Sequence, residues 1–170
     1  MSTLSTYLQV EDVVLDLEVP DKLHLFREIG RHMERVHGLP FDWVVFGLLR
    51  REKAGSTALG EGVAIPHARV RDLGRVCALY LRLSPAISFE TPDGKPVTDV
   101  LGLMVPGPAT EIHLEILADA VSLFSDPAFR ETLHRCNDPA QVKEIFDRWT
   151  SAPLAIQRDF RHYCYPRRVL

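Results

Sequence analysis

The sequence predicts an α/β fold of the α+β-like kind, in which helices pack on a central sheet within a single domain. Helical patterns occupy the first and last thirds of the chain, whereas strand-like apolar runs occupy the middle. Such segregation favours a layered fold of helices on a sheet. The length of 170 residues suits one domain with a substantial core.

Composition limits the possible partners and location. Hydrophobic residues make up 46% of the chain, charged residues 25%, and the net charge is -3, so we expect a globular protein that does not bind nucleic acid. The three cysteines (Cys77, Cys136 and Cys164) are widely spaced and odd in number, which predicts neither a disulfide framework nor a zinc knuckle. With no signal peptide or transmembrane run recognised, we expect a cytoplasmic protein without membrane insertion.

The first third of the chain predicts two helices. Residues 1–20 fit either a strand or a turn of helix. Pro20-Asp21 is typical of a helix start, and apolar residues then follow at steps of three and four: Phe26, Ile29, Met33 and Val36. Gly38 and Pro40 predict its end. We expect Asp42 to cap a second helix that ends near Lys53 and Gly55.

The middle of the chain predicts strands at 63–65, at 76–83, from 87 to 89 onward, and at 97–105. The run 76–83 is apolar at almost every position, as in a central strand covered on both faces. Thr91-Pro92-Asp93-Gly94 is a strong turn signal. Residues 69–74 are predicted to form a polar turn. The last two strands are expected to form a hairpin or to be neighbours.

The last third predicts three helices, starting at Thr110, Asp126-Pro127 and Asp138-Pro139. The first of them has an apolar stripe that consists of Ile112, Ile116, Ala120 and Leu123. We expect residues 1–150 to form the domain and residues 151–170 to be a C-terminal extension. That extension either docks on the domain, mediates self-association or stays loose, and the oligomeric state is open.

One stretch combines glycines with a histidine at the end of a predicted strand. Gly55, Gly60 and Gly62 allow sharp turns and close approach to a ligand. Val63-Ala64-Ile65 suits a short buried strand that Pro66 ends. His67 then follows at the strand end, where it is either a structural histidine or a reactive imidazole.

Residues 51–67 read Arg-Glu-x-x-Gly-Ser-Thr-x-Leu-Gly-x-Gly-Val-Ala-Ile-Pro-His. This stretch resembles the phosphorylation-site signature of enzyme IIA domains of the mannitol/fructose type (type 2). These domains belong to the bacterial phosphoenolpyruvate-dependent phosphotransferase system. The Gly-Ser-Thr form is most similar to the nitrogen-regulatory branch. The resemblance covers roughly residues 8–150 and implies a mixed, roughly five-stranded sheet flanked by helices. Many members have glycine where this chain has Ala68.

The resemblance implies that His67 is the phosphoryl acceptor, a role that a neutral imidazole can perform through the lone pair of one ring nitrogen. It also implies that His113, in a His-Leu-x-x-Leu-Ala context, hydrogen-bonds the phosphoryl group or holds His67 in position. Arg51 either contacts phosphate oxygens through its planar guanidinium or forms a surface ion pair with a carboxylate such as Glu52.

Four further residues are candidate phosphoryl-binding groups. The backbone amides of the Gly60–Gly62 loop can donate hydrogen bonds to the charge that develops during transfer. Ser56 and Thr57 either add hydroxyl donors or serve only the local turn. We expect the apolar residues near His67, namely Leu59, Val63 and Ile65, to form the docking surface.

The other histidines are predicted to be surface residues without a clear ligand pair: His24, His32, His37, His134 and His162. A metal-dependent hydrolase that uses His67 and His113 is a remote alternative, because a catalytic zinc usually needs three protein ligands. A binding-only domain that has lost transfer is another. We expect no metal and no cofactor.

The leading hypothesis is a phosphocarrier and regulatory protein of nitrogen-regulatory type. It would receive phosphate from a histidine-containing phosphocarrier protein and signal through its phosphorylation state to a target such as a kinase, channel or permease. The alternative is a sugar-specific (fructose/mannitol) component that passes phosphate to a permease.

Overall fold

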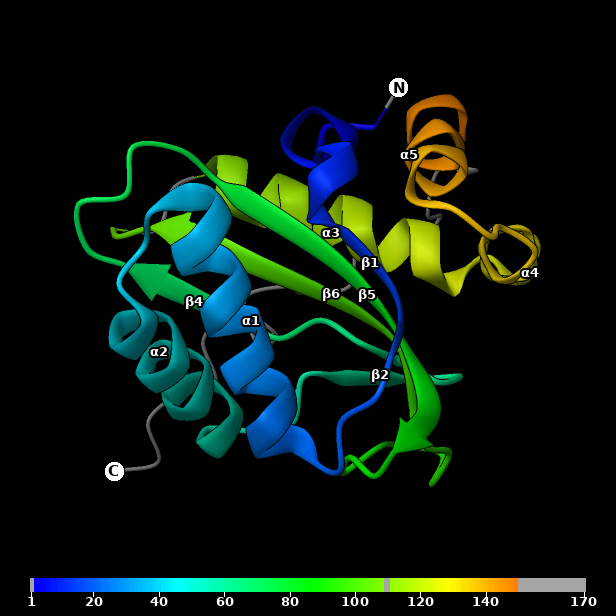
Figure 1. Cartoon of the computed structure of the whole chain (residues 1–170), viewed down its shortest axis with the longest axis horizontal. Helices are drawn as coiled ribbons and strands as arrows, with labels where there is room; N and C mark the ends of the chain where they lie inside the picture. Colours follow the sequence, from blue (N-terminus) through cyan, green and yellow to red (C-terminus); the bar gives the residue numbers. More distant parts are fainter. Residues whose placement is uncertain (1, 109–110, 150–170) are drawn as a thin grey trace.

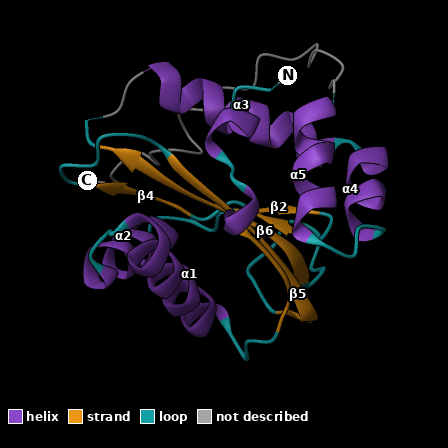
Figure 2. Ribbon diagram, turned by 45° about the horizontal axis from the view of Figure 1, so that its top comes forward, coloured by secondary structure: helices purple, strands orange, loops and turns teal. Residues whose placement is uncertain are grey.

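The protein is described by a computed structural model that covers residues 2–108 and 111–149. Helices cover both faces of one mixed sheet (Figures 1 and 2). The predicted α/β architecture is therefore confirmed. The expectations for residues 151–170, and for a helix start at Thr110, lie outside the described residues.

Within residues 2–108 and 111–149 the sheet contains six strands, in the order β1-β5-β6-β3-β2, with β4 paired to β6. Their bounds are β1 Val13–Leu17, β2 Ala58–Gly60, β3 Val63–Ala64, β4 His67–Val70, β5 Cys77–Ile87 and β6 Val97–Pro106. β5 and β6 are antiparallel and form the predicted hairpin, whereas β1 is parallel to β5. β5 includes Ile87, so the prediction that a new strand begins there is wrong.

Strands β3 and β4 behave as one interrupted strand along β6. Val63 pairs with Asp99 and His67 pairs with Leu103, both in parallel, so the register is unchanged across the break. Six strands thus occupy about five positions, as expected. The prediction of a polar turn from residue 69 is wrong at its start, because β4 runs to Val70. Among the described strands, β4 pairs with β6 alone, so this edge strand tolerates a solvent-facing arginine.

Helices α1 (Lys22–His37) and α2 (Phe41–Lys53) cover one face of the sheet (Figure 2). The Asp21 carboxylate caps α1 by accepting a hydrogen bond from the His24 amide, and Gly38 ends it in the left-handed conformation at φ 69°. Pro40 is the N-cap of α2 and Asp42 lies in its first turn, so the prediction of an Asp42 cap is wrong.

Helices α3 (Glu111–Ser125), α4 (Pro127–His134) and α5 (Pro139–Arg148) cover the other face. Asp126 and Asp138 cap α4 and α5, each followed by proline in the first turn, as predicted. A core of edge-to-face aromatic rings joins these helices to β5, and it consists of Tyr80, Phe124, Phe129 and Phe146. Of the predicted apolar stripe on α3, Ile116, Ala120 and Leu123 are buried, whereas Ile112 is 50% exposed.

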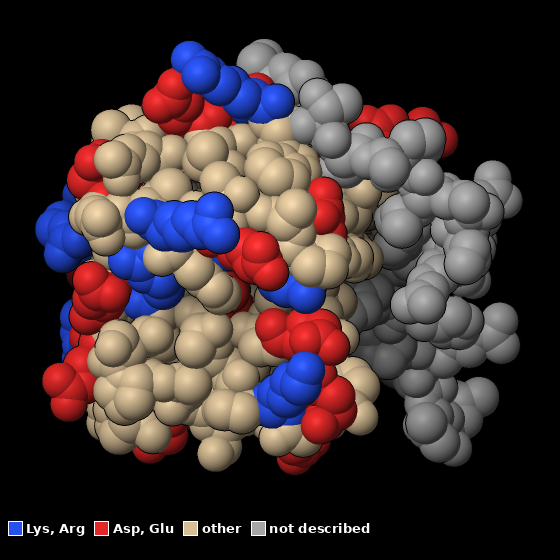
Figure 3. Space-filling model, turned by 90° about the vertical axis from the view of Figure 1, so that its right-hand side faces the viewer, with Lys and Arg blue, Asp and Glu red and all other residues tan. Residues whose placement is uncertain are grey.

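The N-terminal segment forms two short 3-10 helices, η1 (Leu4–Tyr7) and η2 (Val10–Asp12), before β1. Leu4 and Leu8 are buried in the core beneath α3 and α5. No helix in the described ranges is long and apolar enough to cross a membrane. On the face shown in Figure 3, basic and acidic side chains are interspersed rather than gathered by sign.

Candidate functional site

The signature stretch runs from the last turn of α2 through a small hairpin into β4. Gly47 allows α2 to approach β4 closely, because a Cβ atom there would lie 2.8 Å from the Cβ of Ala68. This packing places the C-terminal turn of α2, which carries Arg51, beside the start of β4, which carries His67. A helix end and a strand start thereby form the candidate site.

His67 has one ring nitrogen tied to the backbone. Its Nδ1 lies 2.9 Å from the carbonyl oxygen of Ile65. A carbonyl only accepts hydrogen bonds, so Nδ1 carries the proton and the lone pair of the neutral ring lies on Nε2. The residue is only 3% exposed, and its orientation is therefore fixed by packing as well as by this bond.

Arg51 faces the other ring nitrogen. Its Nε donates a hydrogen bond to Nε2 of His67 at 3.2 Å, and its Nη1 donates to the carbonyl oxygen of Gly55 at 2.7 Å. The guanidinium is thus held on the lone-pair side of the imidazole. The Glu52 carboxylate binds elsewhere, to Lys22 and Thr57.

His113 is buried in the first turn of α3, with 4% exposure. Burial lowers its pKa, and the positive charge of Arg69 lowers the pKa further. Arg69 lies on β4, two residues after His67. Its effect on the pKa of His113 indicates that the start of α3 lies near this strand. A neutral His113 can donate one hydrogen bond from its ring.

Ser56 and Thr57 make turn contacts. The Thr57 hydroxyl donates to Oε2 of Glu52 at 2.6 Å, and its backbone amide donates to the same carboxylate. The Ser56 hydroxyl accepts from the amide of Ala58 at 3.2 Å. These bonds fix the chain between α2 and β2. A direct contact of either hydroxyl with phosphate stays a prediction.

Gly60 and Gly62 form the turn of the β2–β3 hairpin. Residues 60, 61 and 62 all have positive φ, at 91°, 55° and 79°, and Glu61-Gly62 forms a two-residue turn of the type that favours glycine. The Glu61 amide donates to Oδ2 of Asp93 at 2.7 Å. These contacts explain both glycines through the turn, and phosphate binding by the loop stays a prediction.

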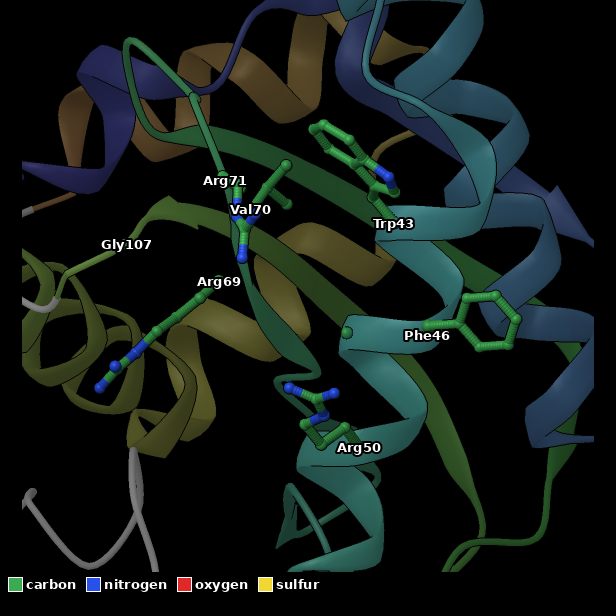
Figure 4. A pocket seen from close by; sticks show the side chains of 8 residues that line it. Trp43, Phe46, Arg50, Arg69, Val70, Arg71 and Gly107 are labelled. Atoms are coloured by element: carbon green, nitrogen blue, oxygen red, sulfur yellow. The ribbon is translucent and has the colours of Figure 1, made fainter.

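A groove of about 510 Å³ lies between α2 and β4, next to this site (Figure 4). Trp43 and Phe46 line it from α2 and are 47% and 67% exposed. Arg50, Arg69 and Arg71 add positive charge. Val63 and Ile65 are buried at 1% and 0% exposure, so the prediction that they form a docking surface is wrong.

Two of the histidines predicted to lie on the surface turn inward instead, His32 buried and His37 partly buried. His32 and His37 both contact Asp12 through Nε2, at 2.8 Å and 2.7 Å, and their side chains are 5% and 6% exposed. His24 and His134 are exposed as predicted, whereas His162 lies outside the described residues. Among the described residues, Asp12, His32 and His37 form the one cluster with the composition of a metal site.

Arg69 was expected to lie in a polar turn, whereas it lies on β4. In a strand, side chains two residues apart point to the same face, so a strand prediction for this segment would have placed Arg69 on the same face as His67. The arginines at 69 and 71 obscured the strand pattern, because strands covered by helices are usually apolar.

Several characterised proteins are similar to this chain. A nitrogen regulatory protein of Bradyrhizobium diazoefficiens is 33% identical over 135 residues, which cover 79% of this chain and 88% of that protein. A nitrogen regulatory protein of Klebsiella oxytoca is 32% identical over 143 residues, or 84% of this chain and 88% of that protein.

Solved structures agree with these relatives. The nitrogen regulatory protein IIA-Ntr of Neisseria meningitidis superposes with a TM-score of 0.80 at 39% identity, over 85% of this chain and 99% of that one. IIA mannitol of Escherichia coli has a TM-score of 0.69 at 20% identity, over 81% of this chain and 97% of that one, and supports the fold alone. The family described as phosphoenolpyruvate-dependent sugar phosphotransferase system, EIIA 2, matches residues 6–149. This chain therefore belongs to the type 2 enzyme IIA family of the phosphotransferase system.

Proposed function

We propose that this protein accepts a phosphoryl group on Nε2 of His67 and signals through its phosphorylation state. The observation that carries the proposal is the pair of contacts on the His67 ring. Nδ1 is bound to the Ile65 carbonyl oxygen, and Nε2 faces the Arg51 guanidinium. The ring thus presents a lone pair at one defined atom, beside a group that binds phosphate oxygens.

The transfer needs no cofactor. The lone pair of Nε2 attacks phosphorus, the nitrogen–phosphorus bond of the donor phosphohistidine breaks, and the donor imidazole leaves with that electron pair. The proton on Nδ1 stays on the His67 ring, where the Ile65 carbonyl stabilises the positive charge of the phosphorylated imidazole. That charge keeps Nε2 a good leaving group for onward transfer.

Arg51 has to exchange partners during the reaction. Its Nε donates to Nε2 of His67 before transfer, and the bond formed with phosphorus takes up that lone pair. The guanidinium can then bind the phosphoryl oxygens with little movement, because its Nη1 remains on the Gly55 carbonyl oxygen. A preorganised donor of this kind stabilises charge that develops in the transition state. His113, buried nearby on α3, is proposed to assist in positioning.

The donor is proposed to be a histidine-containing phosphocarrier protein that docks on the groove beside α2. The exposed rings of Trp43 and Phe46 supply apolar contact area, and Arg50, Arg69 and Arg71 supply positive charge. Exposed aromatic and arginine side chains are typical of interface anchors. Arg69 lines the groove and lies two residues after His67 on β4, so we propose that a donor docked in the groove reaches the acceptor.

The regulatory role is favoured over sugar transport. Two relatives of more than 30% identity carry the name nitrogen regulatory protein, whereas the mannitol protein supports the fold alone. We propose that the output is binding to a target protein such as a kinase, channel or permease, switched by a phosphoryl dianion on the docking surface. The proposed compartment is the cytoplasm.

The test is phosphorylation in a reconstituted system. The full-length chain is incubated with phosphoenolpyruvate, the general phosphotransferase enzyme and its small phosphocarrier, and the intact mass is recorded. We expect one acid-labile phosphate on the unmodified chain and on His24→Ala, a matched variant of an exposed histidine, but none on His67→Ala. An unmodified chain that stays unlabelled beside a charged donor would disprove the carrier function.

A further inference from the structure

A second cluster of titratable side chains lies outside the proposed phosphoryl site. Asp12 is the last residue of η2, His32 lies within α1, and His37 is the last residue of α1. Asp12 and His32 are buried and His37 is partly buried, and their side chains are 0%, 5% and 6% exposed. The end of η2 and the helix α1 thus bring a carboxylate and two imidazoles together.

The two carboxylate oxygens of Asp12 differ in their contacts. Oδ1 of Asp12 lies 2.8 Å from Nε2 of His32 and 2.7 Å from Nε2 of His37. The other carboxylate oxygen, Oδ2, is buried and has no hydrogen-bond partner among the described residues. Native proteins rarely leave such an oxygen unsatisfied, and an ion or water commonly explains one that is.

The outer ring nitrogens face solvent-exposed arginines. Nδ1 of His32 lies 3.5 Å from Nη2 of Arg35, and Nδ1 of His37 lies 3.5 Å from Nη2 of Arg75. An arginine only donates, so these contacts favour rings that carry their proton on Nε2. Both contacts are long and involve exposed arginine side chains, so breaking them costs little free energy. Each ring can then carry its proton on Nδ1 and offer Nε2 as a ligand.

We propose that Asp12, His32 and His37 bind one divalent transition-metal ion of the zinc type. Two imidazole nitrogens and a carboxylate oxygen suit zinc or cobalt better than magnesium or calcium, which prefer oxygen ligands alone. The three ligand atoms lie within 4.8 Å of one another. Tetrahedral zinc places neighbouring ligand atoms about 3.3 Å apart, so the contacts of Asp12 with His32 and His37, at 2.8 Å and 2.7 Å, would lengthen by about half an ångström.

The position at the end of α1 also favours a cation. The C-terminal carbonyl groups of a helix carry partial negative charge, and His37 is the last helical residue. A bound metal would tie the start of β1 to the end of α1. Since an ion that binds only the folded state stabilises it by mass action, the expected role is structural.

Cobalt(II) is the probe that tests the site, because four-coordinate cobalt has a distinctive visible absorption. The untagged full-length chain is titrated with cobalt chloride in the presence of excess magnesium. We expect one cobalt ion per chain with a tetrahedral spectrum, which zinc then displaces.

The variants use amide side chains that keep a polar group at each position. His32→Gln, His37→Gln and Asp12→Asn are expected to weaken cobalt binding by about tenfold or more, since even the loss of an outer partner can cost that much. His24→Gln is the control, because His24 is an exposed histidine on the same helix. Circular dichroism checks that each variant is folded.

Two results would overturn the proposal. One is a folded unmodified chain that takes up no stoichiometric cobalt. The other is a folded His37→Gln variant that binds cobalt as tightly as the unmodified chain. The first result can be read even if every variant fails to fold.

Discussion

The Nε atom of Arg51 donates a hydrogen bond to Nε2 of His67 across 3.2 Å. This contact joins the end of α2 to the start of β4, and it identifies the ring nitrogen that carries the lone pair. It also places a guanidinium beside the position that the phosphoryl oxygens are proposed to occupy after transfer. Three predictions concern this contact, the packing that supports it and the groove beside it, and a fourth concerns the ion pair of His134 with Asp99.

Arg51→Ala should slow phosphoryl transfer to His67 by about 100-fold, the usual cost of removing one preorganised donor. Arg51→Lys should recover only part of the rate, because lysine keeps the charge but lacks the planar set of donors. Rapid-quench labelling at saturating donor measures the rate. Arg31→Ala, on the exposed side of α1, is the control. Full activity of Arg51→Ala would remove Arg51 from the proposed mechanism.

Gly47→Ala should disturb the site without touching its reactive groups. The added methyl would lie 2.8 Å from the Cβ of Ala68, so α2 must move away from β4 and carry Arg51 with it. We expect transfer to slow by about tenfold to 100-fold and stability to fall by about 1–3 kcal/mol. Labelling rates and urea unfolding measure the two effects.

The matched control for that substitution is Gly74→Ala. A Cβ at Gly74 would meet nothing within 4 Å, so both the rate and the stability should stay close to those of the unmodified chain. Equal behaviour of the two variants would contradict the proposed importance of the α2–β4 packing.

Phe46→Ser should weaken docking of the donor. The ring is 67% exposed beside the groove and contributes little to the core, so the fold should persist. We expect the KM for the phosphorylated donor to rise by about tenfold, as for loss of a moderate interface anchor, with kcat nearly unchanged. Leu23→Ser, at a 40% exposed position on α1, should leave both constants unaltered. A fall in kcat alone would exclude the docking role.

His134→Gln should change the pH dependence of stability. The hydrogen bond from His134 to Asp99, at 2.7 Å, raises the pKa of His134 above 6.5, while burial, Arg82 and Arg130 oppose the rise. A raised folded-state pKa means that the stabilisation is complete below 6.5 and is lost as the pH rises through the folded value.

Urea unfolding of both chains at several pH values measures this effect. The unmodified chain should exceed His134→Gln in stability most at about pH 6, and the difference should shrink toward about pH 9. A difference that grew with pH would contradict the assigned ion pair.

Local signals in the sequence predicted much of the fold. Asp21, Asp126 and Asp138 cap helices as expected, because a cap depends on a few neighbouring residues. The apolar run of β5 and the turn at Asp93-Gly94 also predicted the central hairpin. These features need no information from distant parts of the chain.

Features that depend on tertiary contacts were not predicted. His32 and His37 are five residues apart, a spacing that does not place them on one side of a helix, and they meet only because Asp12 lies between them. β4 was not predicted because it contains the exposed Arg69, which suits an edge strand, and the edge position of β4 is not visible in the sequence. The contact of Arg51 with His67 likewise requires the packing of α2 on β4.

The most direct test of the central claim is to identify the ring nitrogen that becomes phosphorylated. Long-range ¹H–¹⁵N and ³¹P spectra of the phosphorylated, ¹⁵N-labelled chain distinguish the two nitrogens of a phosphohistidine. The account predicts phosphate on Nε2 of His67, with the proton kept on Nδ1. Phosphate on Nδ1 of His67, or on His113, would contradict it.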